Sequence, residues 1–210
     1  MKTRPTIRIL CVDDHALVRE GIRLVLEQQP DMRVVGSVGT AEESIALFAQ
    51  IRPDITLMDL RLGSMSGTEA IRSIRRIDPD ARTIVLTVHQ GDEDIYQAMT
   101  AGAVTYVLKD TLADDLIRTI RDVHAGKRPV QPHVQTRLQE HASAPPLTAR
   151  EIQVLEQISQ GLRNREIAIV LGIREETVQV HVSHILDKLD VNDRTAATTV
   201  ALRRGIIQLS

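Results

Sequence analysis

The sequence predicts an α/β protein, with a doubly wound five-stranded parallel sheet followed by a small all-α helix-turn-helix domain. Short apolar runs alternate five times with amphipathic stretches between Ile7 and His124. Prolines then gather between Gly126 and Pro146, and no strand pattern follows Leu147. At 210 residues the chain is long enough for two domains, each with its own core.

Each apolar run has the length of a strand, and the stretch after it has the spacing of a helix. Leu116, Ile120 and Val123, for example, share one helix face. Strands covered by helices on both sides are apolar throughout, as in parallel sheets. The predicted strands are Ile7–Val12, Met32–Val38, Ile55–Met58, Thr83–Val88 and Val104–Leu108.

The stretch between the two predicted domains has the composition of a linker. It holds four of the eight prolines, and only its middle, His133–His141, has the pattern of a short helix. We therefore expect a first domain over residues 1–125, a linker over 126–146 and a second domain over 147–210. Four helices are predicted in the second domain, Thr148–Gln160, Asn164–Leu171, Glu175–Leu189 and Arg194–Arg204.

Composition excludes several classes of protein. The formal net charge is −2, and no stretch approaches the roughly 18 apolar residues of a membrane span. The N-terminus has no cleavable signal pattern, so we expect a cytoplasmic protein. The single cysteine, Cys11, excludes a disulfide scaffold and a zinc cluster and is expected to be a buried core thiol. One phenylalanine and two tyrosines are too few for a single-stranded nucleic-acid platform.

Polar side chains follow the predicted strands where each one ends. Asp13 and Asp14 follow the first strand, Asp59 the third and Lys109 the fifth, and Thr87 lies near the end of the fourth. The carboxyl ends of parallel strands open at one edge of a sheet, so these side chains are expected to converge. Taken alone, Asp14 could be a helix N-cap, Thr87 a strand filler and Lys109 a solvated surface lysine. Five such coincidences indicate a site instead.

Three carboxylates packed together repel one another unless a cation lies between them. An oxygen-rich cluster suits Mg²⁺, which binds oxygen ligands at about 2.0–2.1 Å. Mg²⁺ and Lys109 would stabilise a phosphoryl group during transfer, because catalysis of that step is mostly positioning and charge neutralisation. Asp59 is then the expected nucleophile.

Residues 7–125 resemble the receiver domain of two-component response regulators, which has a flavodoxin-like fold. The resemblance implies that Asp59 accepts a phosphoryl group from the phosphohistidine of a sensor histidine kinase. It also implies that Asp14 and Asp59 bind Mg²⁺ directly with the backbone carbonyl of Arg61, and that Asp13 acts mainly through water. The matching residues are Asp13, Asp14, Asp59, Gly67, Thr87, Tyr106 and Lys109.

The same resemblance assigns Lys109 and Thr87 to the phosphoryl oxygens and makes Tyr106 the switch aromatic. A Thr87 hydroxyl drawn to the added charge leaves space that the Tyr106 ring can fill. The alternative for Tyr106 is a half-buried strand aromatic.

The loops depart from the family pattern in three ways. Asp110 follows Lys109 where many receivers have a cis-proline, so either the loop holds a strained bond or its path differs. Gly63 stands where proline is frequent, and a more mobile loop with weaker metal binding is expected. Arg61 and His89 stand at positions that in this family tune how fast water removes the phosphoryl group.

In the second domain a helix, a tight turn at Gly172 and a second helix form the pattern of a helix-turn-helix, whose second helix enters the major groove. Apolar residues of the second helix form a stripe at i, i+4, i+7 and i+11, namely Val178, Val182, Ile185 and Leu189. The outward-facing residues are Glu176, Gln179, Val180, Ser183 and Asp187.

Residues 147–205 also resemble the LuxR-type DNA-binding domain, and with the receiver they resemble the NarL/FixJ branch of response regulators. The resemblance implies a homodimer, when phosphorylated, on double-stranded promoter DNA. The matches are Leu147–Glu151, Gly161, Asn164–Ala168, Thr177, Val178, His181, Ile185, Lys188, Leu189, Arg194, Thr195 and Ala197.

The second domain is electrically neutral, with eight Arg and Lys against eight Asp and Glu over residues 147–210. DNA-binding domains usually carry a basic excess, so a helical domain that binds protein remains an alternative. Weak monomer binding that depends on pairing is expected, with Ala197, Val200 and Ala201 as a small-residue dimer face. Candidate DNA contacts are Arg163, Asn164, Arg165, Thr177, Gln179, Val180, Ser183, Lys188 and Arg194.

These features predict a phosphorylation-gated transcription regulator that is not a conventional enzyme. One rival is a phosphatase or phosphotransferase with an aspartyl nucleophile, but such enzymes have a second acid two residues later, where this chain has Arg61. The other rival is a pseudo-receiver fused to a protein-interaction module.

Overall fold

The computed structural model describes residues 6–88, 91–130, 132–143 and 145–207, and the chain divides into two compact units. The first contains Met1–Val88 and Gln97–Gln135, and the second contains His89–Tyr96 and Thr136–Ser210. Among the described residues, no helix is both long enough and apolar enough to cross a bilayer.

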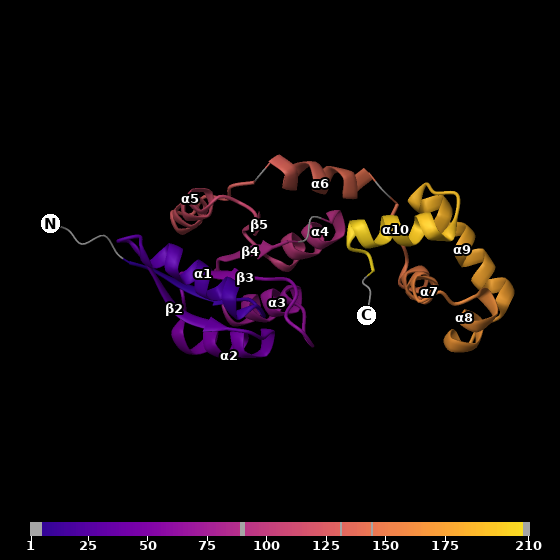
Figure 1. Ribbon diagram of the computed structural model, residues 1–210, viewed down its shortest axis with the longest axis horizontal. Coiled ribbons are helices and arrows are strands. Elements are labelled where there is room, and N and C mark those ends of the chain that lie inside the picture. The colour runs from indigo at the N-terminus through magenta and orange to yellow at the C-terminus, as the bar shows by residue number, and fades with distance from the viewer. Residues whose placement is uncertain (1–5, 89–90, 131, 144, 208–210) are drawn as a thin grey trace. The chain divides into compact units, whose positions relative to one another are not determined.

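The first unit is built on a five-stranded sheet in which all neighbouring strands are parallel (Figure 1). The order β2-β1-β3-β4-β5 confirms the predicted doubly wound fold. The strand β4 ends one residue earlier than predicted, because Val88 is already 65% exposed, and β5 begins one residue later. The strands are β1 (Ile7–Val12), β2 (Met32–Val38), β3 (Ile55–Met58), β4 (Thr83–Thr87) and β5 (Thr105–Leu108).

Five helices alternate with these strands, namely α1 (Ala16–Glu27), α2 (Ala41–Ile51), α3 (Gly67–Ile77), α4 (Asp92–Ala101) and α5 (Ala113–His124). The helices α1 and α5 bury apolar side chains against one face of the sheet, and α3 lies on the other side of the strands from α5 (Figure 1). Leu116, Ile120 and Val123 of α5 are buried, as their spacing predicts. Cys11 is buried in the same core, and this burial raises the pKa of its thiol to about 12.

The rest of the chain is helical, with α6 (Pro132–Ser143), α7 (Ala149–Ser159), α8 (Asn164–Leu171), α9 (Glu175–Leu189) and α10 (Arg194–Arg204). The helix α6 is longer than the short helix predicted in the linker. Thr148, predicted as the first residue of α7, is its N-cap instead. Its side chain accepts from the Glu151 N–H while the Glu151 carboxylate accepts from the Thr148 N–H, which is a capping box.

Apolar residues from α7 to α10 form the core of the second unit. The predicted stripe of α9 faces this core, with three of its residues buried and Val182 half-buried. Gly172 ends α8 with a φ of 64°, a left-handed conformation that favours glycine. The first turns of α4 also belong to this unit, where the buried Asp92 carboxylate accepts from Arg204 Nε and Nη2 at 2.9 to 3.1 Å. The sequence offered no signal for that ion pair.

Candidate functional site

The predicted acidic residues converge where β1 and β3 end. Val12 pairs with Met58, so Asp13 and Asp59 follow neighbouring strands at the same level. The Asp59 N–H donates to the Val12 carbonyl at 2.9 Å. Asp13 and Asp59 are only 2% and 4% exposed, so both carboxylates are withdrawn from water. Two such groups repel each other and require a cation nearby.

Lys109 supplies that cation from the end of β5. Its Nζ lies 2.5 Å from Asp13 Oδ2 and 2.6 Å from Asp59 Oδ2. Burial alone would lower the pKa of Lys109, but hydrogen bonds to the two carboxylates outweigh burial and raise it. Lys109 is therefore an ammonium inside the site, and the alternative of a solvated surface lysine is wrong. The other carboxylate oxygen of Asp59 accepts from the Leu60 N–H at 2.7 Å.

A group of metal-ligating side chains lies beside this pair. Among the described residues, the ligand atoms of Asp13, Asp14 and His15 lie within 4.8 Å of one another, and Lys109 bridges this group to Asp59. Carboxylate oxygens predominate, which is the chemistry that Mg²⁺ prefers, so the cluster is consistent with the Mg²⁺ site of receiver domains. His15 is not among the metal-site residues predicted from the sequence, although it directly follows Asp13 and Asp14. It is also the N-cap residue of α1, so the alternative of Asp14 as that cap is wrong.

Gly67 holds the following loop against Asp59. Its N–H donates to the Leu60 carbonyl at 2.9 Å, and a Cβ at Gly67 would lie only 1.9 Å from the Asp59 carbonyl oxygen. Any residue with a side chain would clash with the Asp59 backbone at this position. Ser66 and Glu69 then form a capping box that fixes the start of α3. The site thus depends on a close backbone contact that spacing alone does not reveal.

Thr87 and Tyr106 lie on the same face of the sheet in neighbouring strands. Tyr106 pairs in register with Val85, and Thr87 is two residues further along β4. Both side chains are completely buried, so the alternative of a half-buried Tyr106 is wrong. The Thr87 carbonyl accepts from the Lys109 N–H at 2.9 Å, which joins this pair to the acidic pocket.

Two of the departures in the loops have a structural explanation. The Lys109–Asp110 peptide is trans, so the loop follows a different path from one with a cis-proline. Gly63 has a φ of 85°, which is outside the range that proline can adopt. His89 lies outside the described residues.

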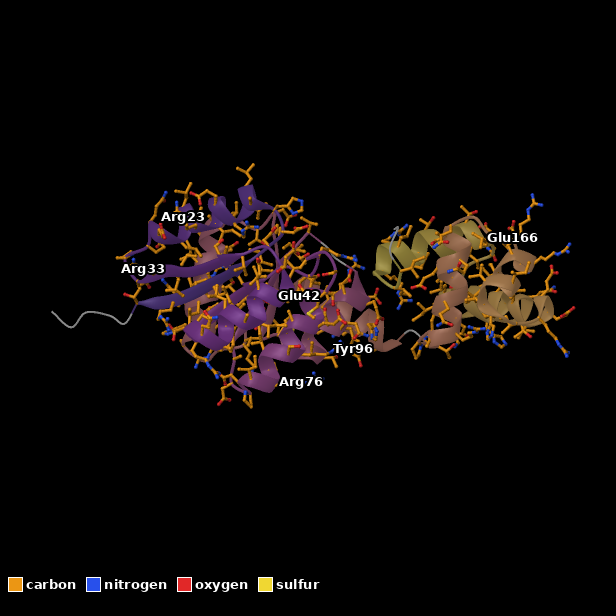
Figure 2. The ribbon with its side chains drawn as sticks, turned by 90° about the horizontal axis from the view of Figure 1, so that it is seen from below. Arg23, Arg33, Glu42, Arg76, Tyr96 and Glu166 are labelled. Carbon is orange, nitrogen blue, oxygen red and sulfur yellow. The ribbon has the colours of Figure 1, made fainter. Side chains whose placement is uncertain are left out.

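The helices α8 and α9 form the predicted helix-turn-helix. Ile167 and Ala168 of α8 are buried in the core that they share with α9. The groove-facing candidates of α9 are exposed, including the apolar Val180 at 52%. Arg163 and Arg165 at the start of α8 are exposed as well, and Glu166, labelled in Figure 2, caps this helix by accepting from the Arg163 N–H at 2.7 Å. The exposed candidates of α9 are Thr177, Gln179, Val180 and Ser183.

Three of the candidate phosphate contacts have partners inside the domain instead. Lys188 Nζ lies 2.8 Å from a carboxylate oxygen of Glu151, and Arg194 Nη2 donates to Asn164 Oδ1 at 2.9 Å. Glu151 is only 3% exposed. The role of Glu151 is not among the features predicted from the sequence, although its spacing from Thr148 is the signal of a capping box.

The small residues of α10 do not form a dimer face. Ala197 and Ala201 are 1% and 0% exposed, and Val200 packs against the same core. The prediction of a dimer surface there is wrong, because small residues at helical spacing pack equally well within a domain and between two copies.

The fold and both sites define a class of protein. Residues 9–121 match the response regulator receiver domain, and residues 145–201 match the luxR family of bacterial regulatory proteins. The chain belongs to the NarL/FixJ family and is a two-component response regulator with a LuxR-type DNA-binding domain, not a conventional enzyme.

Individual relatives extend over nearly the whole chain. The transcriptional regulatory protein YxjL of Bacillus subtilis is 40% identical, over 96% of this chain and 98% of its own length. The response regulator VraR of Staphylococcus aureus is 38% identical, over 97% of this chain and all of its own length. Among solved structures, RcsB of Salmonella enterica bound to a promoter is 25% identical with a TM-score of 0.71, covering 93% of this chain and 97% of RcsB.

Proposed function

We propose that Asp59 is the phosphoacceptor and that its phosphorylation by a sensor histidine kinase gates DNA binding by the second domain. The observation that carries this proposal is the buried Asp59 carboxylate held 2.6 Å from Lys109 Nζ. In the transfer step a carboxylate oxygen of Asp59 bonds to phosphorus while the P–N bond of the phosphohistidine breaks, and its electron pair returns to the imidazole. Lys109 and the Thr87 hydroxyl then contact the phosphoryl oxygens and offset their charge.

In this proposal Mg²⁺ is bound by Asp14, Asp59 and the backbone carbonyl of Arg61, and Asp13 acts mainly through water. These groups are all oxygen ligands, which suits the ion. When bound, it neutralises charge on the phosphoryl oxygens. Lys109, whose Nζ lies 2.6 Å from Asp59 Oδ2, would neutralise the same charge.

Phosphorylation would be read out through Thr87 and Tyr106. The modification adds about −1.5 to −2 charge, which attracts the Thr87 hydroxyl. Because Tyr106 is buried on the same face of the sheet, movement of Thr87 changes the space around its ring and so the surface around α4 and β5. A coupling of about 1–3 kcal/mol between this switch and the second domain suffices for regulation.

For the second domain we propose that α9 is the recognition helix, with Thr177, Gln179, Val180 and Ser183 at base edges. Arg163 and Arg165 are the phosphate contacts that need no rearrangement, because they are already exposed.

The relative RcsB is solved as dimers bound to DNA. We propose a homodimer on promoter DNA here too, because pairing multiplies the contacts of a neutral domain. The working division is a receiver over 1–125, a linker over 126–146 and the DNA-binding domain over 147–210.

The phosphoacceptor is tested by acyl-phosphate labelling with a small phosphodonor and Mg²⁺. Wild-type protein should be labelled and Asp59→Asn should not. Asp54→Asn is a matched control, because Asp54 lies at the other end of the same strand and accepts from the Arg8 N–H. Labelling that persists in Asp59→Asn, or that is lost only in Asp54→Asn, would defeat the proposal.

Gel shifts over a salt series test the second domain. Phosphate contacts release counterions, so affinity for a selected promoter fragment should fall with salt. An affinity that ignores both salt and sequence would favour the protein-interaction module instead.

A further inference from the structure

A second charged cavity lies in the first unit, at the end of the sheet remote from Asp59. Arg82 directly precedes β4 and Val104 directly precedes β5, whereas Thr87 and Lys109 lie at the other ends of those strands. The cavity has a volume of about 340 Å³ and is lined by four cationic side chains, one acid and a small apolar floor. The proposed phosphorylation mechanism does not use it.

Two of the four cations are held in place by backbone carbonyls. Arg82 Nη1 donates to the His124 carbonyl at 3.0 Å, and Arg75 Nη1 donates to the Pro79 carbonyl. Gly102 also makes room for Arg75, since a Cβ there would lie 2.9 Å from Arg75 Nε. A carbonyl partner orients a guanidinium without neutralising its charge. Both arginines are half-buried and line the cavity, so they are only partly exposed to water.

The other two cations come from the segment that follows α5. Lys127 pairs with Asp122 at 2.8 Å, whereas Arg128 is exposed and forms no hydrogen bond or ion pair with any described residue. Asp80 is the acid in the lining. Three arginines therefore face one carboxylate, and the cavity keeps a surplus of positive charge.

The shape and chemistry of the cavity indicate what could fill it. Guanidinium forks match phosphate oxygens bidentately and are weakly hydrated. A volume of about 340 Å³ lies at the small end of ligand pockets, which are roughly 300–1,000 Å³, and a concave space of that size admits a small molecule but not a duplex. Val104 and Val123 supply an apolar floor for an organic group.

We propose that this cavity binds a small anion with a di- or triphosphate group. Inorganic pyrophosphate and a nucleoside triphosphate share that chemistry and serve as the two probes. Binding to the full chain is measured by calorimetry at constant ionic strength without divalent cations. Under those conditions the carboxylates around Asp59 repel anions, so the acidic site does not contribute.

We expect one saturable site for at least one probe, weakened about tenfold or more by Arg128→Glu, because hydrogen bonds to charged groups are strong. Arg82→Gln should weaken it similarly, with thermal unfolding as the check on folding. Arg33→Glu is the matched control and should change affinity by less than about twofold. Arg33, labelled in Figure 2, is an exposed arginine of β2, and β2 and β5 are the two opposite edge strands of the sheet.

The two probes also distinguish the source of the phosphate group. Equal affinities mean that the phosphates alone are recognised, and a tighter nucleoside triphosphate means that the apolar floor takes part. The proposal is overturned by the absence of saturable binding of either probe or by equal weakening from Arg33→Glu. Displacement of a bound probe by a DNA duplex would also overturn it, since the surface would then be a contact for a nucleic-acid backbone.

Discussion

At the scale of single residues, the pocket depends on one ammonium between two buried carboxylates. Asp13 and Asp59 are too buried for water to screen their repulsion, and Lys109 contacts both. In the proposed function the same ammonium contacts the phosphoryl group on Asp59. Both the stability of the fold and the rate of phosphoryl transfer are therefore expected to depend on Lys109.

Lys109→Ala should destabilise the protein and slow its phosphorylation. Loss of one partner of a buried ion pair costs about 3–5 kcal/mol, and Mg²⁺ should restore part of this by neutralising the same carboxylates. Labelling should slow by about 10²–10³-fold, as for other charge-stabilising groups. Urea unfolding with and without Mg²⁺ measures the first effect. Lys127→Ala, which removes an exposed pair, should change stability by less than about 1 kcal/mol, and equal losses in the two variants would contradict this account.

Gly67→Ala and Gly21→Ala should have opposite effects. At Gly67 a methyl group would overlap the Asp59 carbonyl, so the loop would have to move. We therefore expect the free energy of unfolding to fall by more than about 2 kcal/mol and phosphate labelling of Asp59 to weaken. At Gly21, inside α1, a Cβ meets nothing within 4 Å, and alanine should stabilise the helix by about 0.5–1 kcal/mol. Thermal unfolding measures both effects, with a lower midpoint expected for Gly67→Ala and a higher midpoint for Gly21→Ala. A neutral Gly67→Ala would show that the close contact is not needed.

At the scale of elements, Glu151 connects the start of α7 to the end of α9. It completes the capping box of α7 and pairs with Lys188 near the end of α9. Burial acts to raise the pKa of Glu151, but the bonds from Lys188 and Thr148 outweigh burial and lower it. A carboxyl that binds its proton less tightly in the folded state stabilises that state above its ordinary pKa. This contribution to stability is lost as the pH falls through the lowered pKa of Glu151 in the folded state.

Glu151→Gln isolates the ion pair, because glutamine can still complete a capping box. At pH 7 the variant should lose about 1–3 kcal/mol of stability. The difference from wild type should begin to shrink below the ordinary glutamate pKa, where the unfolded chain takes up the proton, and should vanish below the lowered pKa of folded Glu151, where both states are protonated. Urea unfolding at pH 7 and at acid pH measures this, and a difference that is constant with pH would refute the role of the charge.

Arg165→Ala and Lys188→Ala should separate DNA contact from domain stability. Arg165 is exposed at the start of α8, so its loss should reduce the salt dependence of DNA binding by about one phosphate contact. Lys188 is engaged with Glu151, so its loss should lower the unfolding midpoint and leave the salt dependence nearly unchanged. Gel shifts over a salt series, paired with thermal unfolding, test both. The reverse pattern would assign the phosphate contact to Lys188.

Patterning predicted most of the elements because hydrophobic periodicity reports burial directly. The strands β1, β2 and β3 and the helices α8, α9 and α10 have the predicted ends. Periodicity alone cannot separate a polar cap such as Thr148 from the first helical residue, so it predicts the start of α7 one residue too early. Convergence of Asp13, Asp59 and Lys109 was predictable from topology. The close approach at Gly67 was not, because it depends on the path of one loop.

At the scale of the whole molecule, spacing cannot say which surfaces meet. Ala197 and Ala201 appeared suited to a dimer but fill the core of their own domain, and the Arg204–Asp92 pair joins residues that carry no shared motif. The second domain carries no net charge over residues 147–210. A single copy has little electrostatic attraction for DNA, so regulation through pairing is expected to produce a large change in affinity.

The most direct test of phosphorylation-gated DNA binding is the affinity of the full chain for a selected promoter fragment, measured with and without phosphodonor. Wild-type affinity should rise about 5- to 150-fold on phosphorylation, the range of a coupling of about 1–3 kcal/mol. Asp59→Asn should bind equally weakly under both conditions. A wild-type protein that is fully labelled on Asp59 yet binds DNA no more tightly, or an equal rise in Asp59→Asn, would contradict the account.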